Sequence, residues 1–233
     1  DLMQTTGKYG GIGARIAKIG DFVVITDPHE GYPAQKAGLQ SGDAILEIDG
    51  KAVDKYTSDN VSQLLKGEPG TKITLKVKKA ISNEVKIYAF NREEIKIENV
   101  PYFGMVNDKI GYIKLTMFTD NASGEVQDAL KELKKNPNIK GVILDLRGNG
   151  GGLLNEAINI CNTFVEKGTN IVNTKGKIQE ANMQYSTTGK PVDLDIPLAV
   201  LTDGGSASAS EIVSGSIQDL DRGVIIGQNT YGK

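Results

Sequence analysis

The sequence predicts an α/β core that follows a smaller, mainly-β domain. From residue 8 to about residue 92, short strands and tight turns alternate, with only small helices between them. From about residue 94, strands alternate with amphipathic helices, which indicates parallel pairing. We therefore expect two domains, at residues 8–92 and 94–233.

Composition excludes several classes of protein. The chain has 233 residues, of which 39% are hydrophobic and 24% charged, as is typical of globular proteins. The net charge of −2 is spread along the chain and gives no electrostatic footprint for nucleic acid. No run approaches about 18 consecutive apolar residues, so we expect no transmembrane segment. The chain starts without an initiator methionine, which suggests a piece of a longer protein with any targeting segment absent.

The first domain is expected to form a half-open barrel. The segments "GIGARIAKIG" and "DFVVITDP" predict a strand pair, and "DAILEIDG" predicts a strand that ends in an Asp-Gly turn. One helical turn is expected over "PAQKAG", and a helix over "TSDNVSQLLKG" with Ser58 as its N-cap. The segments "TKITLKVKK" and "EVKIYAFNR" alternate with period two and complete the set of strands.

Three blocks of this domain resemble a bacterial PDZ domain. They are "YGGIGARI", "GYPAQKAGLQSGDAILEIDGKAV" and "LLKGEPGTKITLKVKK", in this order. The resemblance places the loop that binds a peptide carboxylate at Gly11, Ile12 and Gly13. Successive N–H groups of such a loop favour an anion, and the next strand offers an edge for a bound peptide. The alternative is that the glycines only shape a turn.

The second domain alternates strands with helices. Strands are expected over "IKIENV", "KIGYIKLTMF", "IKGVILDLRG", "IPLAVLTD" and "RGVIIG". Helices are expected over "NASGEVQDALKELKKN", over "LNEAINICNTFVEKG" and from about Ser208. The strand "IKGVILDLRG" is almost continuously apolar, as expected when both faces of a sheet are covered.

Few residues are available for catalysis. His29 is the only histidine and lies in the first domain, which argues against a Ser-His-Asp triad. The single cysteine, Cys161, lies in an apolar helical stretch and is interpreted as a buried structural thiol. One histidine and one cysteine do not make a zinc site, so no metal is expected. A nucleophilic serine here would need a lysine or a carboxylate as its base.

Ser208 has two interpretations. In "SASEIV" it begins a capping box, with its hydroxyl satisfying a helix N–H and Glu211 reaching back. A helix N-terminus also stabilises the negative charge that develops on a carbonyl oxygen under attack. The local sequence leaves both interpretations open.

A second glycine-rich turn, "DLRGNGGGLL", lies between a buried strand and a helix, so its N–H groups can face an anion. It matches neither the dinucleotide fingerprint nor the P-loop, because Leu153 stands where the third glycine belongs and no Gly-Lys-Ser/Thr follows. An oxyanion pocket fits this turn better than a phosphate site, which remains an alternative.

Three motifs resemble those of the C-terminal processing (tail-specific) peptidases. They are "DLRGNGGGLL", "GSASASEIVSGSIQD" and "GQNTYGK", in this order. The family combines a PDZ domain with an α/β core like that of Clp protease and crotonase. The resemblance implies that Ser208 is the nucleophile and Lys233 its base, without a metal or an organic cofactor. It assigns oxyanion donors to Ala209 and to Gly151 or Gly152, and supporting positions to Glu211 and Asp219.

The environment of the Lys233 amine and the residue at position 203 both bear on whether this chain is active. A lysine with a pKa of about 10.4 is no base at neutral pH, so an apolar pocket must lower its pKa by about 3 units. Val224, Ile225, Ile226 and Tyr231 are expected walls of that pocket. A terminal carboxylate on Lys233 would oppose the shift, since Lys233 is the last residue. Asp203 stands where the family usually has asparagine, and we expect it to perturb the loop before Ser208.

The sequence therefore predicts a serine endopeptidase that cleaves near the C-terminus of protein substrates with a free tail. The alternatives are a non-catalytic PDZ scaffold or chaperone, and a crotonase-like acyl-CoA enzyme with the same glycine-rich geometry. By resemblance the protein is extracytoplasmic, in the bacterial periplasm or cell envelope. Assembly into a homo-oligomer is a further hypothesis.

Overall fold

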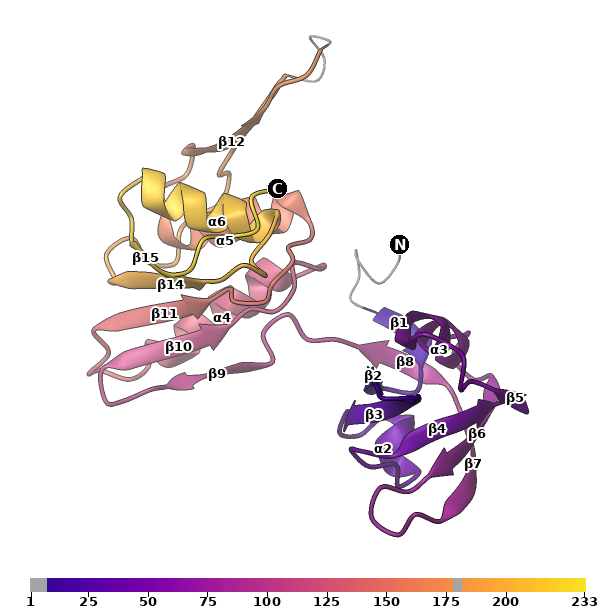
Figure 1. Cartoon of the computed structure of the whole chain (residues 1–233). Coiled ribbons are helices and arrows are strands. Elements are labelled where there is room, and N and C mark those ends of the chain that lie inside the picture. The colour runs from indigo at the N-terminus through magenta and orange to yellow at the C-terminus, as the bar shows by residue number, and fades with distance from the viewer. Residues whose placement is uncertain (1–7, 178–181) are drawn as a thin grey trace. The chain divides into compact units, whose positions relative to one another are not determined.

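The computed structural model describes residues 8–177 and 182–233. These residues divide into two compact units, Lys8–Ile97 and Glu98–Lys233 (Figure 1). The second unit has the α/β architecture and the first is mainly β, as the sequence predicted.

The first unit is built on an antiparallel sheet in the order β2-β3-β4-β6-β7, with β5 beside β4. A separate ribbon pairs β1 with β8, so β8 belongs to this unit, whereas the sequence analysis expected a strand over "IKIENV" in the second domain. The strands are β1 (Lys8–Gly11), β2 (Ala14–Ile19), β3 (Phe22–Pro28), β4 (Ala44–Ile48), β5 (Lys51–Ala52), β6 (Lys72–Lys78), β7 (Val85–Asn91) and β8 (Glu93–Lys96). Since β2 ends the order, one of its edges has no partner strand among the described residues.

Two helices complete the first unit, α2 (Pro33–Lys36) and α3 (Ser58–Leu65). The sequence placed both, but the cap of α3 was predicted one residue too late. Thr57 is the N-cap, and its side-chain oxygen accepts the N–H of Asn60 at 3.2 Å. The positions of the strands follow from their apolar alternation, since Ile73, Leu75 and Val77 of β6 are all buried.

The second unit contains a sheet in the order β15-β14-β11-β10-β9. Strands β10, β11, β14 and β15 run parallel, and β9 pairs antiparallel with β10. The elements of this unit are β9 (Tyr102–Met105), β10 (Ile110–Lys114), α4 (Ala122–Leu133), β11 (Gly141–Asp145), α5 (Leu154–Phe164), β12 (Asn170–Thr174), β13 (Met183–Ser186), β14 (Leu198–Thr202), α6 (Ala209–Asp219) and β15 (Val224–Gly227).

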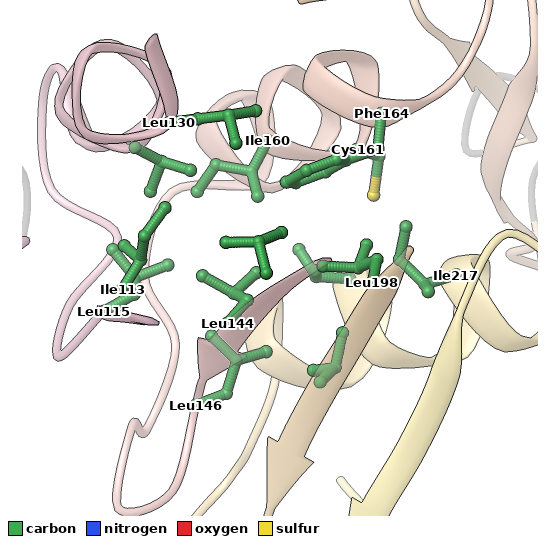
Figure 2. Packing of buried hydrophobic residues seen from close by; sticks show 14 of the residues in the cluster. Ile113, Leu115, Leu130, Leu144, Leu146, Ile160, Cys161, Phe164, Leu198 and Ile217 are labelled. Carbon is green, nitrogen blue, oxygen red and sulfur yellow. The ribbon is translucent and has the colours of Figure 1, made fainter. Parts of the chain in front are cut away.

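One apolar cluster joins the sheet to α4, α5 and α6. Side chains from both the strands and the helices meet in it, among them Leu144, Leu198 and Leu130 (Figure 2). Cys161 of α5 is fully buried there, and this burial raises the pKa of its thiol to about 12. Cys161 is therefore a structural thiol, as predicted.

The sequence analysis did not identify the antiparallel ribbon of β12 and β13, which extends away from the rest of its unit (Figure 1). Strand β9 was missed as well. Among the described residues, no helix combines the length and the apolar character that crossing a bilayer requires.

Candidate active site

Ser208 lies at the turn from a buried strand into a helix. The loop after β14 leads to Ser208, which is the N-cap of α6 and has φ 57° and ψ −113°. A positive φ is uncommon for a residue with a side chain, and it persists only when the surroundings enforce it. A serine held in this way at a strand-to-helix turn exposes its hydroxyl at the end of the sheet.

Glu211 fixes the start of the helix. Its carboxylate accepts the N–H of Ser208 at 2.8 Å, so the reach-back expected of a capping box is present. The N–H of Glu211 in turn reaches the main-chain oxygen of Ser208 at 2.9 Å. Because that N–H also has a main-chain acceptor, the serine hydroxyl is not its only partner in the capping box.

The second glycine-rich turn packs directly against Ser208. A Cβ added to Gly151 would lie 2.8 Å from the Cβ of Ser208, 2.8 Å from the nitrogen of Ala209 and 2.7 Å from the oxygen of Ala207. Gly151 also has φ 98°, a conformation that favours glycine. Only a residue without a side chain allows this close approach, so the structure brings the two predicted motifs together.

The N–H groups around Ser208 differ in their availability. The N–H of Gly151 donates to Asn149 Oδ1 at 2.9 Å. Within the described part of the chain, the N–H groups of Gly152 and Ala209 make no hydrogen bond. Ala209 is the first residue of α6, where a helix leaves its N–H groups unsatisfied. Both N–H groups are therefore available to donate to an oxyanion.

Phe118 holds the glycine turn from the other side. Its N–H donates to the oxygen of Gly151 at 3.2 Å, and its oxygen accepts the N–H of Leu153 at 2.7 Å. A Cβ on Gly152 would lie 2.4 Å from that same oxygen of Phe118. No sequence motif indicated Phe118, because the contact joins residues that are distant along the chain.

An ionic cluster anchors the chain just before the glycine turn. Asp145 is buried at the end of β11 and accepts hydrogen bonds from Arg147 Nη2 at 2.7 Å and Tyr112 Oη at 2.6 Å. Lys114 Nζ lies 3.3 Å from the same carboxylate. Burial alone would raise the pKa of Asp145, but Arg147, Tyr112 and Lys114 together hold it well below its usual range. The sequence analysis did not single out these residues.

The final residues of the chain run beside the start of α6. Glu211 Oε1 accepts the hydroxyl of Thr230 at 2.9 Å and the N–H of Gly232 at 2.6 Å, and Oε2 accepts the N–H of Lys233 at 3.2 Å. Burial would raise the pKa of Glu211, but the N–H groups of Ser208 and Gly232, with the other donors, hold it below its ordinary value. One carboxylate thus binds both the Ser208 turn and the backbone of Lys233.

The Lys233 side chain does not lie in an apolar pocket here. Lys233 is exposed, and the residues expected as walls are mostly exposed as well: Tyr231 at 70%, Val224 at 59% and Ile226 at 52%. Only Ile225 packs against the core. The structure therefore positions the main chain of Lys233 and leaves its amine in contact with solvent.

Asp219 lies at the far end of α6 from Ser208. Since it is the last residue of a helix that begins at Ala209, the two ends are separated by roughly 15 Å. The structure does not bring Asp219 to the Ser208 turn.

In the first unit, the loop of Gly11, Ile12 and Gly13 is held by its carbonyl groups. The oxygen of Ile12 accepts the N–H of Ala34 at 2.9 Å, and the oxygen of Gly13 accepts the N–H of His29 at 2.8 Å. The loop leads into the edge strand β2. A small cavity of about 40 Å³ lies between β2 and α3, lined by Tyr9, Gly11, Ile12, Ala14, Ile16, Ser62, Leu65 and Lys66.

These features define a PDZ unit followed by an α/β peptidase core. The sequence profile of Peptidase family S41 matches residues 109–233, and that of the PDZ domain matches residues 24–79. The chain belongs to peptidase family S41.

Curated relatives agree with this assignment. The chain is 36% identical to the carboxy-terminal-processing protease of Bartonella bacilliformis over 99% of its own length and 53% of that protein. It is 35% identical to a probable CtpA-like serine protease of Staphylococcus aureus, over 98% of its own length and 45% of the relative. The chain thus spans about half the length of the curated relatives it matches.

Solved structures share the fold. The photosystem II D1 C-terminal processing protease matches with a TM-score of 0.56 and 31% identity, over 96% of this chain and 61% of that one. A putative S41 protease from Bacteroides fragilis matches with a TM-score of 0.59 and 21% identity, over 96% of this chain and 65% of that one. The fold is therefore a Clp protease-like α/β core with an N-terminal PDZ domain, which confirms the fold class predicted from the sequence.

Proposed function

We propose that the full-length protein is a serine endopeptidase that cleaves near the C-terminus of protein substrates through a Ser208–Lys233 dyad. Ser208 Oγ attacks the peptide carbonyl while the Lys233 amine takes its proton, and the resulting ammonium gives that proton to the leaving amine. Water then attacks the acyl-enzyme. Lys233 takes the proton of that water and returns one to Ser208 Oγ as the acyl bond breaks.

The observation that carries the proposal is the close packing of Gly151 against Ser208 and Ala209. It leaves the N–H groups of Ala209 and Gly152 open beside a serine in a strained conformation. Donors fixed in this way stabilise the charge on the tetrahedral intermediate, and each donor contributes about 10²- to 10³-fold to the rate. A serine that only caps the helix would need none of these features.

The base function of Lys233 requires a different environment for its amine. In water an ammonium stays protonated at neutral pH, and burial is what lowers its pKa. We propose that the full-length protein encloses this amine. Glu211 already holds the backbone of Lys233 beside the turn at Ser208, because its carboxylate accepts the N–H groups of both residues. Glu211 has the supporting role in this scheme, and its contacts favour it over Asp219.

The PDZ unit is proposed to bind the C-terminal tail of the substrate. The tail would add a strand at the open edge of β2, with its carboxylate at Gly11, Ile12 and Gly13 and its last side chain in the small cavity. The extracytoplasmic location and a homo-oligomeric state remain predictions from the family resemblance.

A fluorophosphonate probe tests the enzyme against the scaffold. We expect covalent labelling of Ser208 in the full-length protein, identified by peptide mass spectrometry, and none in Ser208→Ala. The control Ser214→Ala, in the same helix, should label normally. Tail binding without labelling would support the scaffold instead, and binding of acyl-CoA would support the crotonase-like enzyme.

A further inference from the structure

Asp203 joins the two loops that form the proposed active site. It lies directly after β14, five residues before Ser208, and its Oδ1 accepts the N–H of Gly148 at 2.8 Å and the N–H of Gly205 at 2.9 Å. Gly148 begins the glycine turn, and Gly205 belongs to the loop that carries Ser208. One oxygen atom therefore holds a main-chain group from each loop.

The two loops are in direct main-chain contact at this point. A Cβ on Gly205 would lie 3.0 Å from the Cα of Gly148 and 3.2 Å from Asp203 Oδ1. Neither loop has room to shift toward the other. The hydrogen bonds of Asp203 prevent the opposite movement, in which the loops separate.

Asn149 makes the reciprocal connection. Its main-chain oxygen accepts the N–H of Ala207 at 3.0 Å and the hydroxyl of Ser210 at 2.8 Å, on either side of Ser208. Its side chain holds Gly151 at 2.9 Å and the oxygen of Leu115 at 2.9 Å. Asn149 is fully buried, whereas Asp203 is only half-buried. Asp203 is therefore the partner that can be replaced with less risk to the fold.

We propose that Asp203 is a positioning residue that keeps the oxyanion donors of the glycine turn aligned with Ser208. This inference rests on the proposed function. The sequence analysis expected Asp203 to perturb the loop before Ser208; in the structure its carboxylate accepts the N–H groups of Gly148 and Gly205. The N–H of Gly148, followed by that of Gly205, also lowers the pKa of Asp203, so the carboxylate is charged at neutral pH. An asparagine offers a carbonyl oxygen at the same place.

The test compares Asp203→Ala and Asp203→Asn in the full-length protein. A loop displaced by about 1 Å lowers catalysis by as much as about 10²-fold. We expect Asp203→Ala to reduce kcat about 10- to 100-fold with little change in KM, and Asp203→Asn to restore most of it. Asp128→Ala, which removes an exposed carboxylate of α4, is the matched control and should leave kcat unchanged.

Hydrogen exchange supplies a readout that does not need activity. Asp203→Ala should accelerate amide exchange in peptides covering 146–153 and 203–208, while exchange in β6 of the first unit stays as in the unchanged protein. Unchanged exchange, or a kcat equal to that of the control, would overturn the inference. If the unchanged protein neither labels nor cleaves, the proposed function fails, and exchange alone then decides whether Asp203 joins the loops.

Discussion

The two units of the chain each carry a glycine-containing loop, and the loops differ in what lies beside them. The turn at Gly151 packs against a strained serine, and the N–H groups of Gly152 in the turn and of Ala209 at the start of α6 stay open. The loop at Gly11–Gly13 leads instead into the edge strand β2 and a small cavity without a comparable serine turn. The proposed cleavage and the proposed tail binding therefore depend on different units, so we expect mutations to separate them.

The largest effect should come from the proposed dyad. In the full-length protein, Ser208→Ala and Lys233→Ala should each lower kcat by at least about 10³-fold, because each removes a group that acts in the same step. Affinity for a C-terminal tail peptide, measured by fluorescence anisotropy, should stay within about twofold. Normal cleavage by Lys233→Ala would refute the dyad.

The next effect concerns the glycine turn. Gly151→Ala should lower kcat about 10²-fold, because the added Cβ would meet the Ser208 turn at 2.7–2.8 Å and displace the oxyanion donors. The matched change Gly150→Ala adds a methyl group that meets nothing within 4 Å. Steady-state kinetics should show the second variant within a few-fold of the unchanged protein, and equal losses would contradict the packing argument.

A variant of the small cavity in the first unit should weaken tail binding and leave the reaction at Ser208 unchanged. Ser62 lines the small cavity from α3, so Ser62→Phe should fill it and weaken tail binding about tenfold, which corresponds to about 1.4 kcal/mol. Gln63→Phe, at an exposed neighbouring position, is the control. Titration calorimetry reports the affinity, and the rate of fluorophosphonate labelling at Ser208 should not change in either variant. Loss of labelling in Ser62→Phe would show that the two units do not act separately.

The smallest expected effect is a pH dependence carried by Glu211. Its pKa is lowered from 4.5 in the folded protein, so its contribution to stability is present above that value and is lost as the pH falls through the folded pKa. Glu211→Gln should therefore lower Tm at pH 7, and the difference from the unchanged protein should shrink below about pH 4.5. Thermal unfolding followed by circular dichroism measures this, and a difference that does not depend on pH would argue against the ionised contact.

The sequence predicted the helices and strands that carry a regular apolar or capping pattern, and it missed those without one. The apolar alternation of "TKITLKVKK" identified β6, and Ser208 followed by Glu211 identified the start of α6. The ribbon of β12 and β13 was missed because a ribbon outside the core leaves no buried face to produce a regular apolar pattern.

Only part of the candidate site was predicted, because only part of it is encoded in local motifs. Its motifs are local, so Ser208 and the glycine turn were found from the sequence. The contacts of Asn149, Phe118 and Asp203 join loops that are distant along the chain, and only the folded structure brings them together. The environment of the Lys233 amine depends on residues that are close to it in space. The apolar residues next to it in the sequence were expected to enclose it, and most of them are exposed.

The most direct test of the central claim is a crystal structure of the full-length protein with a fluorophosphonate bound to Ser208. We expect Lys233 Nζ within about 3.2 Å of Ser208 Oγ and enclosed by apolar side chains, with the phosphonyl oxygen on the N–H groups of Ala209 and Gly152. A solvated Lys233 amine far from Ser208, or a phosphonyl oxygen turned away from these donors, would contradict the account.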